Sequence, residues 1–270
     1  MNLNAEGFLT IQQPKSSKSL TLAFQHEDMR QEWISYLSSA CIPFLISDYK
    51  PLRVIGAGQW GRVVVCRKGG HSRLLAVKEV VLSPKHVLKH VIQERLIMQE
   101  IPKHDFVVSL HESARVGNCL YLVMEFMPGG DLFTYLGQNR VHRDTCNIYA
   151  AEVLLALEHF HAHNIIYRDL KPENILVGPT GHLKLADLGL AKVLEGEHGK
   201  TFTLCGTECY LAPEMIRRKP YGKSVDVWAY GCFLYELHAG RSPFWRPRDE
   251  RENLHSEIVE GRFEMACEVP

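Results

Sequence analysis

Short apolar runs separated by polar breaks fill the first part of residues 49–270. Four of these runs are rich in β-branched residues and are typical of strands. They are residues 52–55, 63–66, 74–81 and 120–126. Residues 85–101 instead place apolar side chains at helical spacing, which predicts an amphipathic helix before the last of these strands. Its predicted apolar face consists of Val91, Leu96, Ile97 and Met98.

The remainder of the chain is mainly helical in its pattern. Two long segments carry apolar residues at helical spacing, residues 146–163 and 225–238. A small β-rich part followed by a larger α-rich part predicts an α+β fold of two lobes with a cleft between them. A length of 270 residues allows one large domain or two smaller ones.

Residues 1–48 differ in character from the rest. Leu20, Leu22 and Phe24 alternate with Thr21 and Ala23, which predicts a half-buried strand. Residues 27–40 follow with apolar side chains, Trp33 among them, at helical spacing and acidic residues in the first turn, which predicts a helix. The alternative to an independent fold is a short extension that packs this helix on the neighbouring domain.

A strand followed by a helix that carries one tryptophan resembles the C-terminal end of a pleckstrin-homology domain. The early strands of that family, between which its lipid-binding loop lies, are missing from this segment, so we expect no direct lipid binding. The chain then divides into three parts. They are a pleckstrin-like remnant at residues 1–41, a linker at residues 42–48 and the main domain at residues 49–270.

Composition and charge narrow the classes of function. Lys+Arg and Asp+Glu both total 31 and the sequence pI is about 7.2, so no overall basic excess points to nucleic acid. The eight cysteines form no CxxC pair, which argues against a zinc site and favours reduced thiols. His159, His161 and His163 have a spacing that does not face one way on a helix, which favours a solvated helix end over a metal site.

No targeting or membrane segment is evident in the sequence. The first residues lack a basic segment followed by an apolar core, and no apolar run approaches the about 18 residues needed to span a bilayer. These features predict a cytoplasmic protein.

The turn between the first two predicted strands has the sequence GAGQWG, with glycines at Gly56, Gly58 and Gly61. A dinucleotide-binding turn has the same spacing, but a helix follows directly after its third glycine. Here a strand-like run follows, which favours a loop that lies over phosphates, with an ordinary glycine hairpin as the alternative. Lys78, which ends the run LAVK, becomes a phosphate ligand if a carboxylate holds it, and Glu94 on the next helix is placed to do so.

Residues 167–177 read YRDLKPENILV and place Asp169, Lys171 and Asn174 within six residues. This cluster is either a solvated turn or a site that holds a hydroxyl, a phosphate and a metal ion together. Asp187 follows a strand-like run and precedes Gly189 in the sequence DLG. A carboxylate at a strand end suits a metal site because it can reach an ion without blocking it.

These motifs occur in one order along the chain: GxGxxGxV, AVK, the glutamate, YRDLKPEN, DLG, APE and DxWxxG. In this order they resemble the protein kinase family from about Tyr49 onward. The wording FMPGGDLFTYL at residues 126–136 and TFTLCGTECYLAPEMI at residues 201–216 is similar to the AGC group of serine/threonine kinases. The pleckstrin-like remnant favours an RAC/Akt-like relative within that group.

The resemblance implies a bilobal kinase fold with ATP and Mg²⁺ as cofactors, and it assigns roles to residues. Catalysis would use Lys78 and Glu94 at the α- and β-phosphates, Asp169 as proton acceptor, Lys171 at the γ-phosphate and Thr207 as their support. Asn174 and Asp187 would hold Mg²⁺. The ATP-binding residues would be Gly56, Gly58, Gly61, Val63, Ala76, Lys78, Glu125, Met127, Asp131 and Leu176.

The resemblance also implies regulation and substrate choice. Thr203 matches the activation-loop phosphorylation site of this group, with Thr201 as the fallback acceptor. The cations that would meet a phosphate there are Arg168, Lys192 and His90. Glu173 and Glu236 match acidic positions that receive basic residues upstream of the acceptor serine or threonine. The expected partners are therefore protein substrates with upstream basic residues and an upstream activating kinase.

Two departures from the family pattern matter. DLG stands where DFG is usual, and Leu188 preserves the apolar packing. The chain stops at Pro270, before the last helices of the family's C-lobe and before the arginine that normally pairs with Glu214, so we expect a truncated C-lobe. The alternatives to an active kinase are an inactive pseudokinase scaffold, against which the intact catalytic residues argue, and a lipid adaptor acting through residues 1–48.

Overall fold

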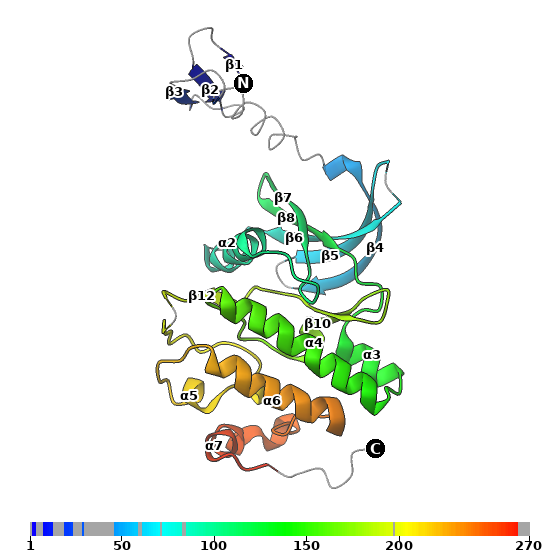
Figure 1. Cartoon of the computed structure of the whole chain (residues 1–270), viewed down its shortest axis with the longest axis vertical. Coiled ribbons are helices and arrows are strands. Elements are labelled where there is room, and N and C mark those ends of the chain that lie inside the picture. The colour runs from blue at the N-terminus through cyan, green and yellow to red at the C-terminus, as the bar shows by residue number, and fades with distance from the viewer. Residues whose placement is uncertain are drawn as a thin grey trace. The chain divides into compact units, whose positions relative to one another are not determined.

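The computed structural model describes residues 2–3, 8–12, 19–23, 29, 46–58, 61–70, 72–82, 85–196 and 198–263. The chain forms two compact units, Met1–Asp48 and Tyr49–Pro270. Figure 1 labels their helices and strands. Among the described residues, no helix combines the length and apolar character that crossing a membrane requires.

The first unit contains a small antiparallel sheet in the order β1-β2-β3. Its strands are β1 Asn2–Leu3, β2 Phe8–Gln12 and β3 Ser19–Ala23. β3 confirms the strand predicted from residues 20–24, whereas β1 and β2 were not predicted. Apart from Met29, the helix predicted over residues 27–40 lies outside the described residues, so the pleckstrin-like interpretation of this unit stays a prediction.

The second unit begins with a five-stranded antiparallel sheet in the order β4-β5-β6-β8-β7 (Figure 1). Its strands are β4 Tyr49–Gly58, β5 Gly61–Lys68, β6 Leu74–Val81, β7 Leu110–Val116 and β8 Cys119–Glu125. The four predicted strands are present. β7 was missed because none of its side chains is fully buried and its sequence, LHESARV, lacks an apolar run.

Helix α2, Lys85–Glu100, lies beside this sheet in Figure 1. Val91 packs with Val80 of β6 and with apolar side chains of β8. Because residues three apart share one face of a helix, the packing of Val91 also turns Glu94 toward the sheet. The predicted apolar face was right for Val91 and Ile97, which are buried, and wrong for Leu96, which is 41% exposed.

The rest of the second unit is mainly helical, as the sequence predicted (Figure 1). Its helices are α3 Leu132–Gln138, α4 Arg143–Ala162, α5 Pro213–Ile216, α6 Ser224–Ala239 and α7 Leu254–Glu260. The 3-10 helices are η2 Pro172–Asn174, η3 Glu208–Tyr210 and η4 Arg248–Asn253. α4 begins three residues before its predicted start. Together the sheet and the helices form the predicted α+β fold, with a small β-rich lobe followed by a larger helical lobe.

Two short strand pairs frame the candidate site. β9 Ile165–Ile166 pairs with β12 Lys192–Val193, and β10 Ile175–Val177 pairs with β11 Leu183–Leu185. The buried core beneath them includes Tyr149, Phe160 and Phe233, from α4 and α6. The strand pairs and this core therefore fix the ends of the two segments that carry the candidate site, residues 167–174 and 186–191.

Backbone hydrogen bonds join the segment after α2 to the helical lobe. The Val108 N–H donates to the carbonyl of Leu185 at 2.9 Å, and the Leu185 N–H donates to the carbonyl of Phe106 at 2.9 Å. The end of α2 is thus tied to β11, the strand that leads to Asp187. Six cysteines lie in the described part of the chain, and all six are free thiols, as predicted.

Candidate active site

The two lobes meet through Lys78 of β6. Its ammonium group donates to both carboxylate oxygens of Glu94, at 2.7 and 2.9 Å, and to Oδ1 of Asp187 at 3.2 Å. Burial opposes the charge of Lys78, but the two carboxylates outweigh it and raise the pKa of Lys78 above its usual range. The predicted pairing of Lys78 with Glu94 is therefore present, and the ammonium stays charged.

Asp187 follows β11 in a backbone conformation that is uncommon for a residue with a side chain. Its φ is +52°, in the left-handed region. The Gly189 N–H donates to Oδ1 of Asp187 at 3.4 Å. Burial acts to raise the pKa of Asp187, but Lys78 outweighs it and holds the pKa below its usual range. The site thus keeps an ionised carboxylate beside the Lys78 ammonium.

Asp169, Lys171, Asn174 and Thr207 form one hydrogen-bonded group. The Thr207 hydroxyl donates to Oδ1 of Asp169 at 2.9 Å and accepts from Lys171 Nζ at 2.8 Å. Lys171 Nζ also lies 3.0 Å from Oδ2 of Asp169. The Asn174 amide donates to Oδ2 of Asp169 at 2.7 Å and to its carbonyl at 2.8 Å. These contacts exclude the interpretation of residues 167–177 as a solvated turn.

Asp226, fully buried in the first turn of α6, holds the start of this loop. Its carboxylate accepts the N–H groups of Tyr167 at 2.9 Å and of Arg168 at 2.8 Å. It also lies 2.7 Å from Nε2 of His161 on α4. Sequence reasoning noted the motif DVWAYG but gave Asp226 no role. The signal was an acidic residue at the start of an otherwise apolar helix, which indicates a buried carboxylate with partners.

The glycine turn joins β4 and β5, whose register pairs Gly58 with Gly61. A side chain at Gly61 would bring its Cβ to 1.9 Å from the carbonyl oxygen of Glu79 in β6, so close packing demands glycine there. Gly56 has room for a Cβ. Residues 59–60, which include Trp60, lie outside the described residues.

Several apolar residues predicted to bind ATP come from neighbouring strands of the small lobe and from β10. Val63 pairs with Lys78, and Ala76 pairs with Met124. Leu176 of β10 forms a bridge with Asp131, and Met127 is buried nearby in the chain. These residues lie on or beside β6, the strand of Lys78, and in the segment that connects β8 to α3. Their contact with a nucleotide stays a prediction.

Two of the predicted ATP-binding acids use their side chains elsewhere. The Glu125 carboxylate accepts the Ser109 N–H at 2.7 Å and lies 2.9 Å from Lys184 Nζ, and the Glu125 N–H donates to the Ser109 carbonyl at 3.2 Å. The Asp131 carboxylate caps α3 by accepting from the N–H of Thr134 at 2.8 Å and from its hydroxyl at 2.9 Å. An N-cap residue of this kind was not predicted.

The loop that carries Thr203 connects to Arg168 through Tyr221. Thr203 is exposed, and its carbonyl accepts the Tyr221 hydroxyl. The Arg168 guanidinium donates to the Tyr221 oxygen at 3.1 Å and to the carbonyl of Leu190 at 2.7 Å. Arg168 itself has a φ of +71°, in the left-handed region that is uncommon for a residue with a side chain.

Thr201, the fallback acceptor, lies in a different setting. Its side chain is 3% exposed, and its hydroxyl accepts from Lys192 Nζ at 2.8 Å. Its backbone exchanges two hydrogen bonds with Tyr221, both at 2.9 Å. Lys192 therefore lies in β12 and is bonded to Thr201, and His90 is exposed on α2.

The two acids predicted to select basic substrate residues lie within electrostatic reach of each other. Glu173 is exposed in η2, and Glu236 of α6 accepts the Tyr210 hydroxyl. Burial raises the pKa of Glu236, the Tyr210 hydrogen bond opposes the rise, and the negative charge of Glu173 adds to it. A cation between the two carboxylates would offset the repulsion between them and would lower the pKa of Glu236.

Glu214 was expected to lack the arginine that normally pairs with it. The Ser224 hydroxyl donates to Oε1 of Glu214 at 3.0 Å, and the Glu214 side chain is only half-buried. Within the described residues, no basic side chain lies in ion-pair distance of Glu214. A half-buried carboxylate with one hydrogen bond keeps part of its hydration, so the expected penalty is smaller than for a fully buried one.

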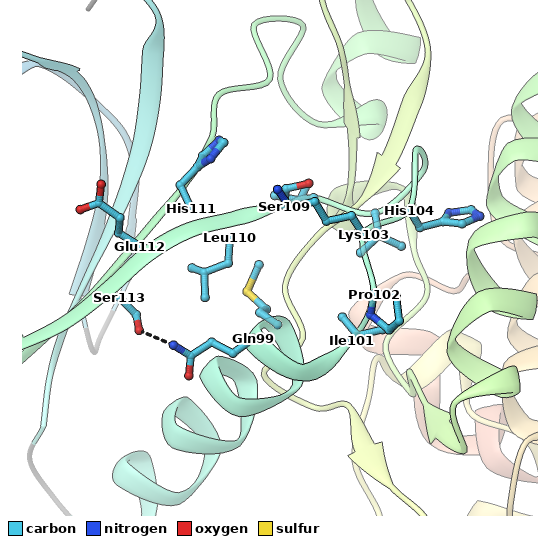
Figure 2. A pocket seen from close by; sticks show the side chains of 13 residues that line it. Gln99, Ile101, Pro102, Lys103, His104, Ser109, Leu110, His111, Glu112 and Ser113 are labelled. Carbon is cyan, nitrogen blue, oxygen red and sulfur yellow. Dashed lines mark hydrogen bonds between the residues drawn. The ribbon is translucent and has the colours of Figure 1, made fainter. Parts of the chain in front are cut away.

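The histidines of α4 have distinct surroundings. His161 pairs with Asp226, whereas His159 stacks on His104 with ring centroids 4.6 Å apart and also approaches His163. His104 borders a pocket of about 310 Å³ between the end of α2 and β7, from which Figure 2 shows its ring pointing away. No group of three or more metal-ligating side chains suited to an ion occurs among the described residues.

Asp187 and Asn174 fit a magnesium ion as a pair. Asn174 donates with its amide nitrogen, which leaves its amide oxygen as an acceptor. Asp187 uses Oδ1 toward Lys78 and Gly189, which leaves Oδ2 for an ion. Mg²⁺ commonly keeps several waters and takes only one or two protein carboxylates or amides in phosphate-transfer sites, so two oxygens are a suitable set.

Comparison with known proteins agrees with this geometry. The protein kinase domain family matches residues 49–268. The cAMP-dependent protein kinase catalytic subunit 3 of Drosophila melanogaster is 41% identical over 226 residues, which cover 81% of this chain and 37% of that protein. The serine/threonine-protein kinase Sgk1 of Gallus gallus is 42% identical over 205 residues, which cover 74% of this chain and 47% of that protein.

The chain belongs to the protein kinase family, and its relatives place it in the AGC type that the motifs predicted. Membership of this family implies ATP and a divalent metal as cofactors. The chain spans between 37% and 47% of the length of these two curated relatives.

Proposed function

We propose that this protein is a serine/threonine protein kinase that transfers the γ-phosphate of ATP to hydroxyl groups of protein substrates. The observation that carries the proposal is the shared hydrogen-bonding of Asp169, Lys171 and Thr207, beside the charged Lys78–Glu94 pair. Phosphoryl transfer depends mainly on positioning and on charge stabilisation. This arrangement supplies a carboxylate and two ammonium groups at fixed positions.

Each residue has a distinct task in the proposed reaction. The substrate oxygen forms a bond to the γ-phosphorus, the bond to the bridging oxygen of ADP breaks, and Asp169 accepts the proton of the hydroxyl. Lys171 balances the charge that develops on the transferring group, and Thr207 keeps Asp169 and Lys171 in register. Lys78 binds the phosphates that remain on ADP.

The proposed metal site uses Asp187 and Asn174. A bound Mg²⁺ would supply positive charge between the phosphates and orient them. The Asn174 amide connects that site to Asp169, because it donates to the Asp169 carboxylate at 2.7 Å. A change at Asn174 would therefore disturb both the metal site and the proton acceptor.

We propose that the kinase prefers substrates with arginine upstream of the acceptor. Glu173 and Glu236 support this, since the charge of Glu173 adds to the raised pKa of Glu236 and neither carboxylate has a cationic partner among the described residues. A substrate guanidinium would hydrogen-bond both carboxylates and would lower the pKa of Glu236. We also propose that an upstream kinase phosphorylates Thr203, and that the phosphate orders the loop around Thr203 by pairing with Arg168.

The test is transfer of labelled γ-phosphate from Mg-ATP to an Arg-x-x-Ser peptide, with Asp187→Asn as the matched variant. We expect transfer by the unaltered chain and its loss in the variant, because the amide cannot neutralise the metal. Absence of transfer by the unaltered chain, assayed with Thr203 phosphorylated, would contradict the proposed activity. Equal turnover of a peptide without arginine would contradict only the basic preference.

A further inference from the structure

Basic side chains gather on the turn between α5 and α6, beside the loop that carries Thr203 (Figure 1). Thr201 and Tyr221 exchange two backbone hydrogen bonds at 2.9 Å, which bring Lys200 to the same turn. The Lys200 ammonium lies 3.2 Å from the position that a Cβ on Gly222 would take. We call the following five residues the basic patch: Lys200, Arg217, Arg218, Lys219 and Lys223.

The positive charges of the basic patch are not neutralised by the rest of the chain that the structure describes. Among those residues, no carboxylate lies in ion-pair distance of any of the five side chains. Lys223 Nζ donates to the amide oxygen of Asn164 at 2.9 Å, and the Arg217 guanidinium donates to the carbonyl of Val259 at 3.0 Å. Both acceptors are neutral. Because like charges repel, an anionic ligand would lower the electrostatic energy of the patch.

Arg218 occupies a backbone position that usually carries glycine. Its N–H donates to the carbonyl of Met215 at 3.0 Å, and the Lys219 N–H donates to that of Glu214 at 2.9 Å. These two bonds form a Schellman motif, in which the residue after the helix is left-handed, and Arg218 has a φ of +52°. In the described part of the chain, its guanidinium has no hydrogen-bond partner. A side chain that is disfavoured locally, with no compensating contact, indicates a functional constraint.

The side chains of the basic patch lie at different depths. Arg218 and Lys219 are exposed, whereas Lys223 is half-buried and its ammonium is bonded to Asn164. A flat anionic surface such as a bilayer meets the exposed cations first and leaves Lys223 apart. An extended chain with several carboxylates can follow the turn and pair with both kinds. The patch therefore fits an acidic polypeptide better than an anionic membrane.

We propose that the basic patch docks an acidic segment of a partner protein, rich in aspartate and glutamate. The two arginines can each bind a carboxylate through two parallel N–H groups, and the three lysines act as point charges. This surface takes no part in the proposed phosphoryl transfer. Tyr221, which follows the turn, donates to the carbonyl of Thr203, so a partner held on the patch lies beside the Thr203 loop.

Binding of a synthetic peptide to the full chain tests this inference. The probe is a fluorescein-labelled peptide of alternating glutamate and glycine, and the matched peptide has glutamine in place of every glutamate. Fluorescence anisotropy at low ionic strength measures each dissociation constant. We expect the glutamate peptide to bind at least about tenfold more tightly than the glutamine peptide, and added salt to reduce that difference.

Two double variants separate the patch from general attraction. Arg218→Gly/Lys219→Gln should raise the dissociation constant of the glutamate peptide about tenfold. Arg53→Gln/Arg67→Gln removes the same charge at exposed positions on the sheet and should leave it nearly unchanged. The single variant Arg218→Gly should weaken binding and yet keep or raise the melting temperature, because glycine suits the left-handed position. A purely structural role for Arg218 predicts the opposite change in melting temperature.

Three results would overturn the inference. The first is an equal dissociation constant for the glutamate and glutamine peptides. The second is binding that survives Arg218→Gly/Lys219→Gln. The third is co-sedimentation with phosphatidylcholine vesicles that contain phosphatidylserine, lost in the same variant, without binding of the glutamate peptide. Because the peptide assay contains no ATP, its failure leaves the proposed kinase activity standing, and a failure of phosphoryl transfer leaves the docking surface standing.

Discussion

The buried carboxylate of Asp226 accepts the backbone N–H of Arg168 at 2.8 Å, although 58 residues separate them in the chain. Arg168 has a φ of +71°, so its backbone is held in a conformation that a side chain disfavours. One oxygen of the same carboxylate also accepts the Tyr167 N–H at 2.9 Å. α6 therefore fixes the backbone immediately before Asp169.

Asp226→Asn should lower both stability and turnover. The amide group of asparagine would place a donor against a backbone N–H, which leaves a buried donor unpaired. We expect the free energy of unfolding to fall by about 1–3 kcal/mol in urea denaturation. Asp144→Asn, at an exposed acid of α4, is the matched control and should change it little. Equal values for the two variants would show that Asp226 does not hold the loop.

Removal of Lys78 should cost more stability than removal of Glu94. Lys78→Met leaves the Glu94 carboxylate unpaired and only 2% exposed, which should cost about 3–5 kcal/mol. The Lys78→Met/Glu94→Leu double variant should recover much of this loss, because no buried charge remains. A double-mutant cycle by denaturation measures the recovery. Additive losses would contradict a coupled pair.

The exposed pair Arg62–Glu79 provides a comparison for that cycle. Its side chains are 58% and 22% exposed and lie 2.8 Å apart. Arg62→Met should cost much less stability than Lys78→Met, because solvent screens an exposed pair. A loss as large as that of Lys78→Met would show that burial does not set the difference.

Thr207 should be replaceable by serine but not by alanine. Its hydroxyl lies between Asp169 and Lys171, at 2.9 and 2.8 Å, and serine retains that hydroxyl. We expect Thr207→Ala to lower kcat about 100-fold through loss of positioning, with the KM for ATP nearly unchanged. Thr207→Ser should keep kcat within about fivefold. Similar rates for the two variants would remove Thr207 from the proposed mechanism.

Thr203, and not Thr201, should carry the activating phosphate. Thr203 is exposed, whereas Thr201 is 3% exposed and bonded to Lys192. Mass spectrometry of the protein after treatment with an activating kinase should find phosphate on Thr203. Thr203→Ala should lose the activation, whereas Thr201→Ala should still be phosphorylated at Thr203. Phosphate on Thr201, or full activity of Thr203→Ala, would contradict the assignment.

Stability should fall as the solution is acidified below neutral pH, partly because of His104. Burial, with the charge of His159 as a further cause, lowers the pKa of His104, while Asp105 and Glu158 oppose and Lys184 adds to the shift. The unfolded chain then binds more protons than the folded chain below about pH 6.5, so unfolding becomes easier as pH falls toward the folded pKa.

His104→Phe should reduce that dependence. The melting temperature measured between about pH 7.5 and 5.5 should change less in the variant, because the ring stack with His159 is kept without a titrating group. An unchanged slope in His104→Phe would show that His104 does not contribute.

Local sequence patterns predicted the parts of the site that are close in the chain. Asp169, Lys171 and Asn174 lie within six residues, so their spacing alone places them together. Lys78 and Glu94 were predicted to pair because a strand leads directly into a helix whose apolar face includes Val91. In these places the local pattern and the final packing agree.

Long-range partners could not be predicted in the same way. Asp226 reaches Arg168 across 58 residues, and nothing in the spacing of its motif identifies that partner. Asp131 was predicted to bind ATP, which stays a prediction, whereas the cap that its carboxylate makes on α3 was not predicted. The exposed Leu96 shows that helical spacing gives the direction of a face but not its width, because the neighbouring element decides which edge is covered.

The backbone bonds that Leu185 makes with Phe106 and Val108 have a mechanical consequence for Glu94. They tie the segment that follows α2 to the helical lobe, so a rotation of the helix would pivot near its C-terminal end. Glu94 lies six residues before Glu100, a lever arm of about 9 Å along the helix. A swing of about 10° would carry Glu94 about 1.6 Å, which is enough to part it from Lys78. A small rotation of α2 is thus enough to make or break the Lys78–Glu94 ion pair.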